Sequence, residues 1–190
     1  MPLIGSDNIV IPPGIYLLTI VGVDDVSMLG DLDIFSRELT ITGAGINETI
    51  IDGNGIDRIF HSNNSTLTIQ DLTLQNGGDF SETVLGGGVI FIGAPAHMLT
   101  LNNIRFENNR ANAGGGLYIS GSFGELTSAS IKNSIFNNNT TVALGVTNSY
   151  GPAIYCRFCD IQVNATTISN NHFGSYALKW FTGNVELYSE

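Results

Sequence analysis

The stretch LTLNNIRFENN, residues 99–109, occurs three times in this chain with small changes. LTIQDLTLQNG (67–77) precedes it by 32 residues and ASIKNSIFNNN (129–139) follows it by 30. In the quoted copy, apolar residues alternate with polar ones in two short runs, Leu99 and Leu101, then Ile104 and Phe106. A two-residue period predicts β-strands, and the change of phase between the runs predicts a bend. The expected bends lie at Asn102-Asn103, Gln70-Asp71, Lys132-Asn133 and Asn164-Ala165.

These copies belong to a longer series of repeats, whose first inward residues are separated by 28, 32, 30, 32 and 24 positions. A third short run of alternating inward and outward residues precedes these repeats, in GGGVIF, GGGLYI, GPAIYC and SYALKW. Three short strands per repeat predict an all-β fold, a right-handed parallel β-helix of six or seven coils. A β-sandwich is the alternative, but its hairpin turns are not favoured by this long period. The expected inward ladders are Leu39, Leu67, Leu99, Ala129, Ile161 and Val185, and Leu74, Phe106, Phe136 and Ile168.

An asparagine column, Asn76, Asn108, Asn138 and Asn170, is expected at one turn of the coil. Asparagine tolerates left-handed backbone angles, and stacked amides can hydrogen-bond between coils. We therefore attribute the asparagine excess to structure. The chain is expected to form one domain, with residues 1–38 as the N-terminal cap and first coil and 39–190 as repeating coils with an open C-terminal end.

The composition narrows the classes of partner. The 190 residues carry a net charge of −10, from 17 acidic and 7 basic residues, and 43% of residues are hydrophobic. This charge disfavours nucleic acids and anionic membrane surfaces as partners, because both are bound by clustered Lys and Arg. No apolar run reaches the length of a membrane span. The N-terminal MPLIGSDN has neither the basic patch nor the apolar core of a signal peptide, so we expect Met1 to begin either an expressed fragment or a cytosolic protein.

Two sets of residues resemble known families. The pairing of GGG[VL] with F-x-x-N, at 86–89 with 106–109 and at 114–117 with 136–139, resembles the repeats of polymorphic outer-membrane proteins. Residues 8–76, including LTITGAGINETIIDGNGIDRIFH, are similar to the β-helical region of large bacterial surface proteins of the CSLREA-domain type. The resemblance implies a right-handed β-helix and a secreted or cell-surface location, whereas the roles of such proteins are mostly unassigned.

The sequence offers little sign of catalysis. Polysaccharide-acting β-helices need converging carboxylates, and the acids here are scattered, while His61, His97 and His172 lie at different phases of the coil. Asp52, in IDGNG, is expected to be a turn residue. We therefore expect no catalytic residue, no metal site and no cofactor. One alternative is calcium, for which the loop residues Asp24, Asp25, Asp31 and Asp33 supply oxygen ligands; otherwise this is a solvated loop.

The motif CRFC places Cys156 and Cys159 three residues apart. One such pair has too few ligands for structural zinc and lacks the helix N-terminus of a thioredoxin site. Two buried thiols beside a tight turn and a small-loop disulfide are the two main interpretations, and redox or metal functions are the others.

Binding, if present, is expected on a lateral stripe or at the open end of the solenoid. The outward column of the third strand, Ile90, Tyr118, Tyr155 and Lys179, suits a glycan or a surface protein. The alternative is that these side chains do not bind a ligand. They would then either stack on one another and stabilise the sheet, or be covered by a loop. Trp180, Val185 and Leu187 lie at the C-terminal end, where the chain either continues in a longer β-helix or self-associates end to end. The expected function is non-catalytic adhesion or display; the alternatives are a fibre subunit built by coil stacking and a polysaccharide-acting lyase or hydrolase.

Overall fold

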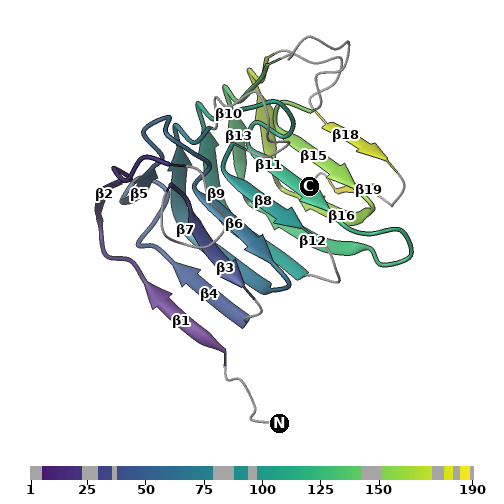
Figure 1. The fold of residues 1–190 in the computed structure, drawn as a ribbon, viewed down its shortest axis with the longest axis horizontal. Helices are drawn as coiled ribbons and strands as arrows, with labels where there is room; N and C mark the ends of the chain where they lie inside the picture. Colours follow the sequence, from purple (N-terminus) through teal and green to yellow (C-terminus); the bar gives the residue numbers. More distant parts are fainter. Residues whose placement is uncertain are drawn as a thin grey trace.

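The computed structural model describes residues 6–22, 30–35, 38–78, 88–93, 98–142, 151–172, 178–181 and 185–188. For residues 91–93, 178–181 and 185–188 it describes the backbone only. The described residues form strands and turns and contain no helix. Every pairing between named strands is parallel, and each strand pairs with a strand of the next coil, which confirms a parallel β-solenoid (Figure 1).

The solenoid has three faces along which strands stack in sequence order. The first face contains β1 (Asp7–Val10), β4 (Glu38–Thr42), β7 (Thr66–Gln75), β9 (Met98–Glu107), β12 (Thr127–Lys132), β16 (Cys159–Asn164) and β19 (Val185–Tyr188). The second face contains β3 (Leu32–Phe35), β6 (Phe60–Asn63), β8 (Ile90–Gly93), β11 (Leu117–Ser120), β15 (Ile154–Arg157) and β18 (Leu178–Phe181). The third face contains β2 (Gly14–Leu17), β5 (Thr49–Asp52), the second halves of β7 and β9, β13 (Ile135–Asn137) and β17 (Thr167–Ser169). A separate pair, β10 (Arg110–Ala111) and β14 (Thr140–Thr141), lies beside these faces.

The number of turns is smaller than the sequence predicts. The solenoid has about four turns, against the six or seven coils expected. On the first face, β4, β7, β9, β12 and β16 each have a partner strand on both sides.

The core consists of the predicted ladders. The column from Leu39 to Val185 pairs in the expected register through all six positions. The second ladder is also confirmed, from Leu74 through Phe106 and Phe136 to Ile168. At its centre the Phe106 and Phe136 rings stack with centroids 4.4 Å apart and an interplanar angle of 7°. Both rings are fully buried, so the interior is filled by side chains from successive coils.

The predicted bends divide the long strands between the first and third faces. Asp71, Asn103, Asn133 and Ala165, the second residue of each predicted pair, all have a left-handed φ between 45° and 59°. Such angles turn the chain sharply, and Asn and Asp adopt them at lower cost than most residues do. The bend signal in the sequence is therefore correct in all four copies.

Two parallel columns of asparagine side chains occupy the next turn of the coil. Asn76, Asn108, Asn138 and Asn170 are left-handed, as expected for a turn, and Asn138 Nδ2 donates to Asn108 Oδ1 at 2.6 Å. The residues that follow three of them, Asn109, Asn139 and Asn171, form a second column facing the interior. Its amides bond from coil to coil, with Nδ2 of each residue 2.9 Å from Oδ1 of the next. These are the asparagines of the F-x-x-N signature, and their role is structural.

The first coil differs from the central ones because its apolar side chains face solvent. β1, β2 and β3 pair with β4, β5 and β6 on one side. Ile9 is 47% exposed and Tyr16 is 39% exposed, whereas their register partners in the next coil, Ile41 and Ile51, are 3% and 4% exposed. Val10 and Ile15 are 75% and 70% exposed. The other exposed apolar residues of this coil are Leu17, Ile20, Val21, Leu32 and Phe35.

Candidate functional site

The predicted outward stripe lies on the second face, and its register is correct in part. Tyr118 pairs with Tyr155, and Tyr155 with Lys179, as expected. Ile90 was placed in this stripe wrongly, because it pairs with Leu117 and is fully buried in the core. The position opposite Tyr118 belongs to Phe91.

The error comes from aligning the two glycine runs residue by residue. Gly88 donates its backbone N–H to the carbonyl of Gly114, and a Cβ at Gly88 would lie 2.2 Å from the carbonyl oxygen of Gly115. Gly88 therefore lies opposite Gly115, whereas the sequence alignment paired it with Gly116. This shift of one residue exchanges inward and outward positions, since side chains alternate along a strand.

The two tyrosines do not form an exposed platform. Tyr118 is 5% exposed and Tyr155 is 6% exposed; their rings lie 4.9 Å apart and pack with Ala113 in a small apolar cluster. Burial raises the pKa of the Tyr118 hydroxyl, against smaller effects of a hydrogen bond with Ser120 and the charge of Arg157. The interpretation that this stripe is covered therefore fits, and binding by Tyr118, Tyr155 and Lys179 stays a prediction.

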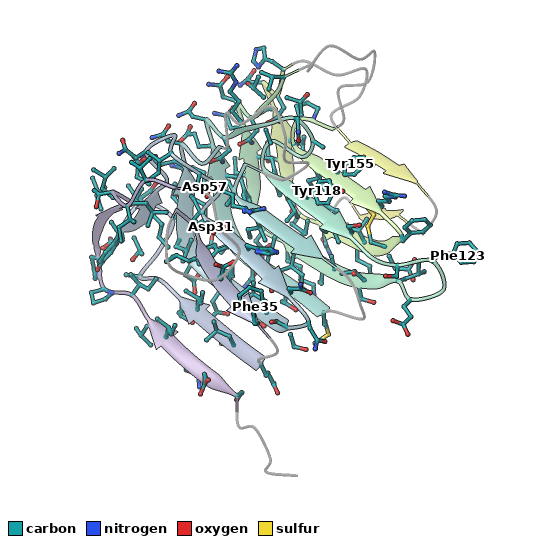
Figure 2. All side chains as sticks on the ribbon, in the orientation of Figure 1. Asp31, Phe35, Asp57, Tyr118, Phe123 and Tyr155 are labelled. Carbon is teal, nitrogen blue, oxygen red and sulfur yellow. A yellow bond between two sulfur atoms is a disulfide. The ribbon has the colours of Figure 1, made fainter. Side chains whose placement is uncertain are left out.

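The N-terminal end of the same face carries ionisable side chains, which we call the Asp–His cluster: Asp31, Asp33, Asp57, Arg58 and His61. Asp33 of β3 and His61 of β6 are register partners, and Asp33 Oδ1 lies 2.9 Å from His61 Nδ1. Arg58 Nε donates to Asp31 Oδ2 just before these strands. The backbone N–H of Arg58 donates to Asp57 Oδ1 at 2.7 Å. Figure 2 shows Asp31 and Asp57 on the half of the face opposite to the tyrosines.

Burial dominates the electrostatics of this cluster. The Asp31 side chain has no exposed surface, and its desolvation raises the pKa of that carboxyl to about 7. Asp57 and Asp33 raise the pKa further through charge repulsion, whereas the Arg58 guanidinium lowers it. A carboxyl group that titrates near neutrality can donate or accept a proton. The described side chains of this cluster are closed to solvent, so no substrate reaches the group in this conformation.

Sequence reasoning missed the Asp–His cluster because it treated the carboxylates as scattered and His61 as isolated. A signal was present: Asp33 and His61 are 28 residues apart, which equals the first repeat offset. Of the predicted calcium ligands, Asp31 and Asp33 lie in the cluster, while Asp24 and Asp25 lie outside the described residues, as does His97. Asp52 is a turn residue as expected, because Oδ1 accepts from the Asn54 N–H at 2.8 Å.

A groove with a volume of about 360 Å³ crosses β9, β12 and β16 on the first face. It forms where Ser128 and Ser130 of β12 lie between longer side chains of the two neighbouring strands. Hydroxyl, carboxylate, amide and thioether groups line it: Met98, Thr100, Ser128, Ser130, Asp160 and Gln162. We call this surface the lateral groove. Strand alternation places these side chains outward, but it does not reveal that the small serines leave space.

An aromatic loop precedes the lateral groove in the chain. Residues 121–126 form a tight turn in which Ser122 and Glu125 exchange backbone hydrogen bonds of 3.0 Å. Phe123, at the tip, is 91% exposed and extends away from the solenoid (Figure 2). Its ring meets Phe158 edge to face with centroids 6.3 Å apart.

The remaining sequence candidates lie at the C-terminal half. Cys156 and Cys159 are buried and joined in a disulfide, which was one of the two main interpretations of CRFC. Trp180 pairs with Cys156, Val185 with Ile161 and Leu187 with Val163, so all three continue core columns. β18 and β19 are the last strands of their stacks.

No protein-family model, curated protein or solved structure matches this chain. Strand pairing alone therefore supports the parallel solenoid fold. The resemblance to CSLREA-type surface proteins and to polymorphic outer-membrane repeats stays a prediction. Within the described residues, no helix has the length and apolar character required to cross a bilayer.

Proposed function

We propose that this chain is a non-catalytic binding module of a secreted or cell-surface protein, which contacts a glycan through the lateral groove. The observation that carries the proposal is the groove itself, a hollow on a rigid face lined by alternating hydrogen-bonding groups. Successive strands repeat these groups about every 4.8 Å. The resemblance to bacterial surface proteins supports the proposed location.

The groups in the lateral groove suit a sugar better than an apolar ligand. Thr100, Ser130 and Gln162 are register partners and offer hydroxyl and amide groups across three coils. Asp160 adds a carboxylate, which accepts hydrogen bonds from neighbouring hydroxyls of a ligand. Met98 is exposed and supplies an apolar contact beside them. Specific polar groups around a small apolar surface are typical of binding sites that fix the orientation of a ligand.

A glycan array probed with the purified chain tests this proposal. Ser130→Phe fills the groove with an aromatic ring and is expected to weaken binding at least about tenfold, the effect of losing roughly 1.4 kcal/mol of contacts. Thr167→Phe is the matched control, since Thr167 is exposed on the third face, away from the groove. The absence of binding on the array, or equal binding by both variants, would count against a glycan and leave a protein partner for this surface to be tested by the same variants.

A second function is favoured by the exposed apolar residues of the first coil. We propose that this coil stacks on the terminal coil of a second copy, so that the chain is also a structural subunit of a fibre. Among the described strands, β1, β2 and β3 each pair on one side only, and nine large apolar side chains on or near them are exposed. Unpaired strand edges and apolar surface together favour addition of another coil.

Light scattering over a concentration series tests this stacking. The wild-type mass is expected to rise with concentration. The double variant Ile9→Asp, Tyr16→Asp is expected to remain a monomer, because these residues stand in inward columns and charge there opposes burial by a second coil. Phe123→Asp is the control, as it changes an exposed apolar residue on a loop away from the first coil. A wild-type chain that stays monomeric throughout would refute the proposal.

A further inference from the structure

Three groups of the Asp–His cluster lie close enough to share one ion. One carboxylate oxygen each from Asp31 and Asp33 and one ring nitrogen of His61 all lie within 4.8 Å of one another. Ligand atoms bound tetrahedrally to one zinc ion at about 2.0–2.2 Å are roughly 3.3–3.6 Å apart. Side-chain rotations that move these atoms by about 1 Å are therefore enough to bring all three around one ion.

A buried carboxylate oxygen points to a missing partner at this place. Oδ2 of Asp31 accepts from Arg58 Nε, but Oδ1 is buried without a hydrogen-bond partner among the described residues. Buried polar atoms are almost always paired, and an unpaired one costs free energy. The bond from Arg58 fixes the carboxylate and leaves Oδ1 as the atom available to a cation.

A third buried carboxylate lies at the same place. Asp57 has no exposed surface, and its carboxylate lies against the residue before Asp31, because a Cβ on Gly30 would be 2.3 Å from Asp57 Oδ2. Negative charge is costly in the interior, and a divalent cation bound here would offset that cost.

The donor set selects the kind of ion. Imidazole nitrogen with carboxylate oxygen suits Zn²⁺, Co²⁺ or Mn²⁺, whereas Ca²⁺ and Mg²⁺ are bound almost wholly by oxygen. We propose that Asp31, Asp33 and His61 bind a divalent transition-metal ion, with Zn²⁺ as the reference ion. The ion links the first coil, through β3, to the second coil, through β6, and so fixes the two coils together. This site is independent of the lateral groove and of coil stacking.

Titration of the metal-free chain with Zn²⁺ tests the site by isothermal calorimetry. We expect one ion per chain and at least about tenfold weaker binding by Asp33→Asn and by His61→Gln, which keep the size of the side chains. His172→Gln is the matched control, because His172 is exposed and distant in the coil stack. Equal affinity of all variants, or loss of binding in His172→Gln alone, would overturn the assignment.

A second measurement on the unmutated chain keeps the test valid if a cluster variant fails to fold. Zn²⁺ added to ¹⁵N-labelled protein is expected to shift the ring-nitrogen signals of His61 and to leave those of His172 unchanged. Co²⁺ in place of Zn²⁺ is expected to give visible absorption bands that Zn²⁺ displaces. The absence of any histidine shift at millimolar Zn²⁺, or shifts confined to His172, would refute the site.

Discussion

The first coil and the central coils share one pattern of alternation but differ in burial. Ile9 of β1, Ile41 of β4 and Ile69 of β7 follow one another in a single register column. Ile9 is 47% exposed, Ile41 is 3% exposed and Ile69 is fully buried. The residue type and the strand position are the same, so the difference comes from the neighbours. A coil of a solenoid buries its core only when other coils cover it from both sides.

The strongest test of this comparison uses the same substitution at both places. Ile69→Ala is expected to lower the free energy of unfolding by about 2–5 kcal/mol, because it leaves a cavity between packed coils. Ile9→Ala is expected to cost less than about 1 kcal/mol, since much of the side chain is already in water. Urea denaturation of the two variants at low protein concentration measures both values. Similar losses would mean that the first coil is as tightly packed as the centre.

The Asp–His cluster, between the first and second coils, predicts a dependence of stability on pH. The pKa of the Asp31 carboxyl is about 7 in the folded chain, against an ordinary value of 3.8, so between these pH values the folded chain holds a proton that the unfolded chain has lost. The contribution of Asp31 to the free energy of unfolding is therefore greatest below about pH 4. It decreases as the pH rises to about 7, by no more than about 4 kcal/mol.

Urea denaturation at several pH values, compared between wild type and Asp31→Asn, isolates this contribution. The variant has no carboxyl at position 31, so its stability is expected to fall less between pH 4 and pH 7 than that of wild type. The carboxylates outside the Asp–His cluster contribute equally to both proteins and cancel in the difference. Parallel curves would show that the first coil does not desolvate Asp31.

The smallest expected effect distinguishes the two asparagine columns of the central coils. Asn139→Ala is expected to cost about 1–3 kcal/mol, because Phe106 O and the amides of Asn109 and Asn171 lose a buried partner. Asn138→Gly is expected to cost about 1 kcal/mol or less, since it removes an exposed amide and keeps the left-handed angle accessible. Thermal unfolding of the pair gives the comparison, and a larger loss for Asn138→Gly would reverse it.

Local patterns made most of the fold predictable. Alternation identified the inward residues of both ladders, and the phase changes located the left-handed residues Asp71, Asn103, Asn133 and Ala165. The repeat offsets gave the register on the first face through Val185. Prediction failed at Ile90, because the glycine run before it aligns with the next one after a shift of one residue. Because glycine has no side chain, a run of glycines shows no alternation of inward and outward residues from which the register can be predicted.

The candidate sites were predictable only in part. Tyr118 and Tyr155 have the predicted register, yet their burial involves packing with Ala113, which lies outside the predicted columns. The Asp–His cluster joins residues from 31 to 61, and the lateral groove depends on how far each side chain extends between three strands. Both arise from contacts between coils.

The sequence by itself determined the strands, the bends and the columns of this solenoid, because these follow from interactions that repeat within one coil and between equivalent residues. Only the tertiary structure decided which residues of a column meet water, which acids lie near His61, and where a hollow remains. Those properties depend on nonequivalent neighbours, such as Ser130 between Thr100 and Gln162. Burial, desolvation and charge repulsion depend on which residues are close in space, and residues close in space can be far apart in the sequence.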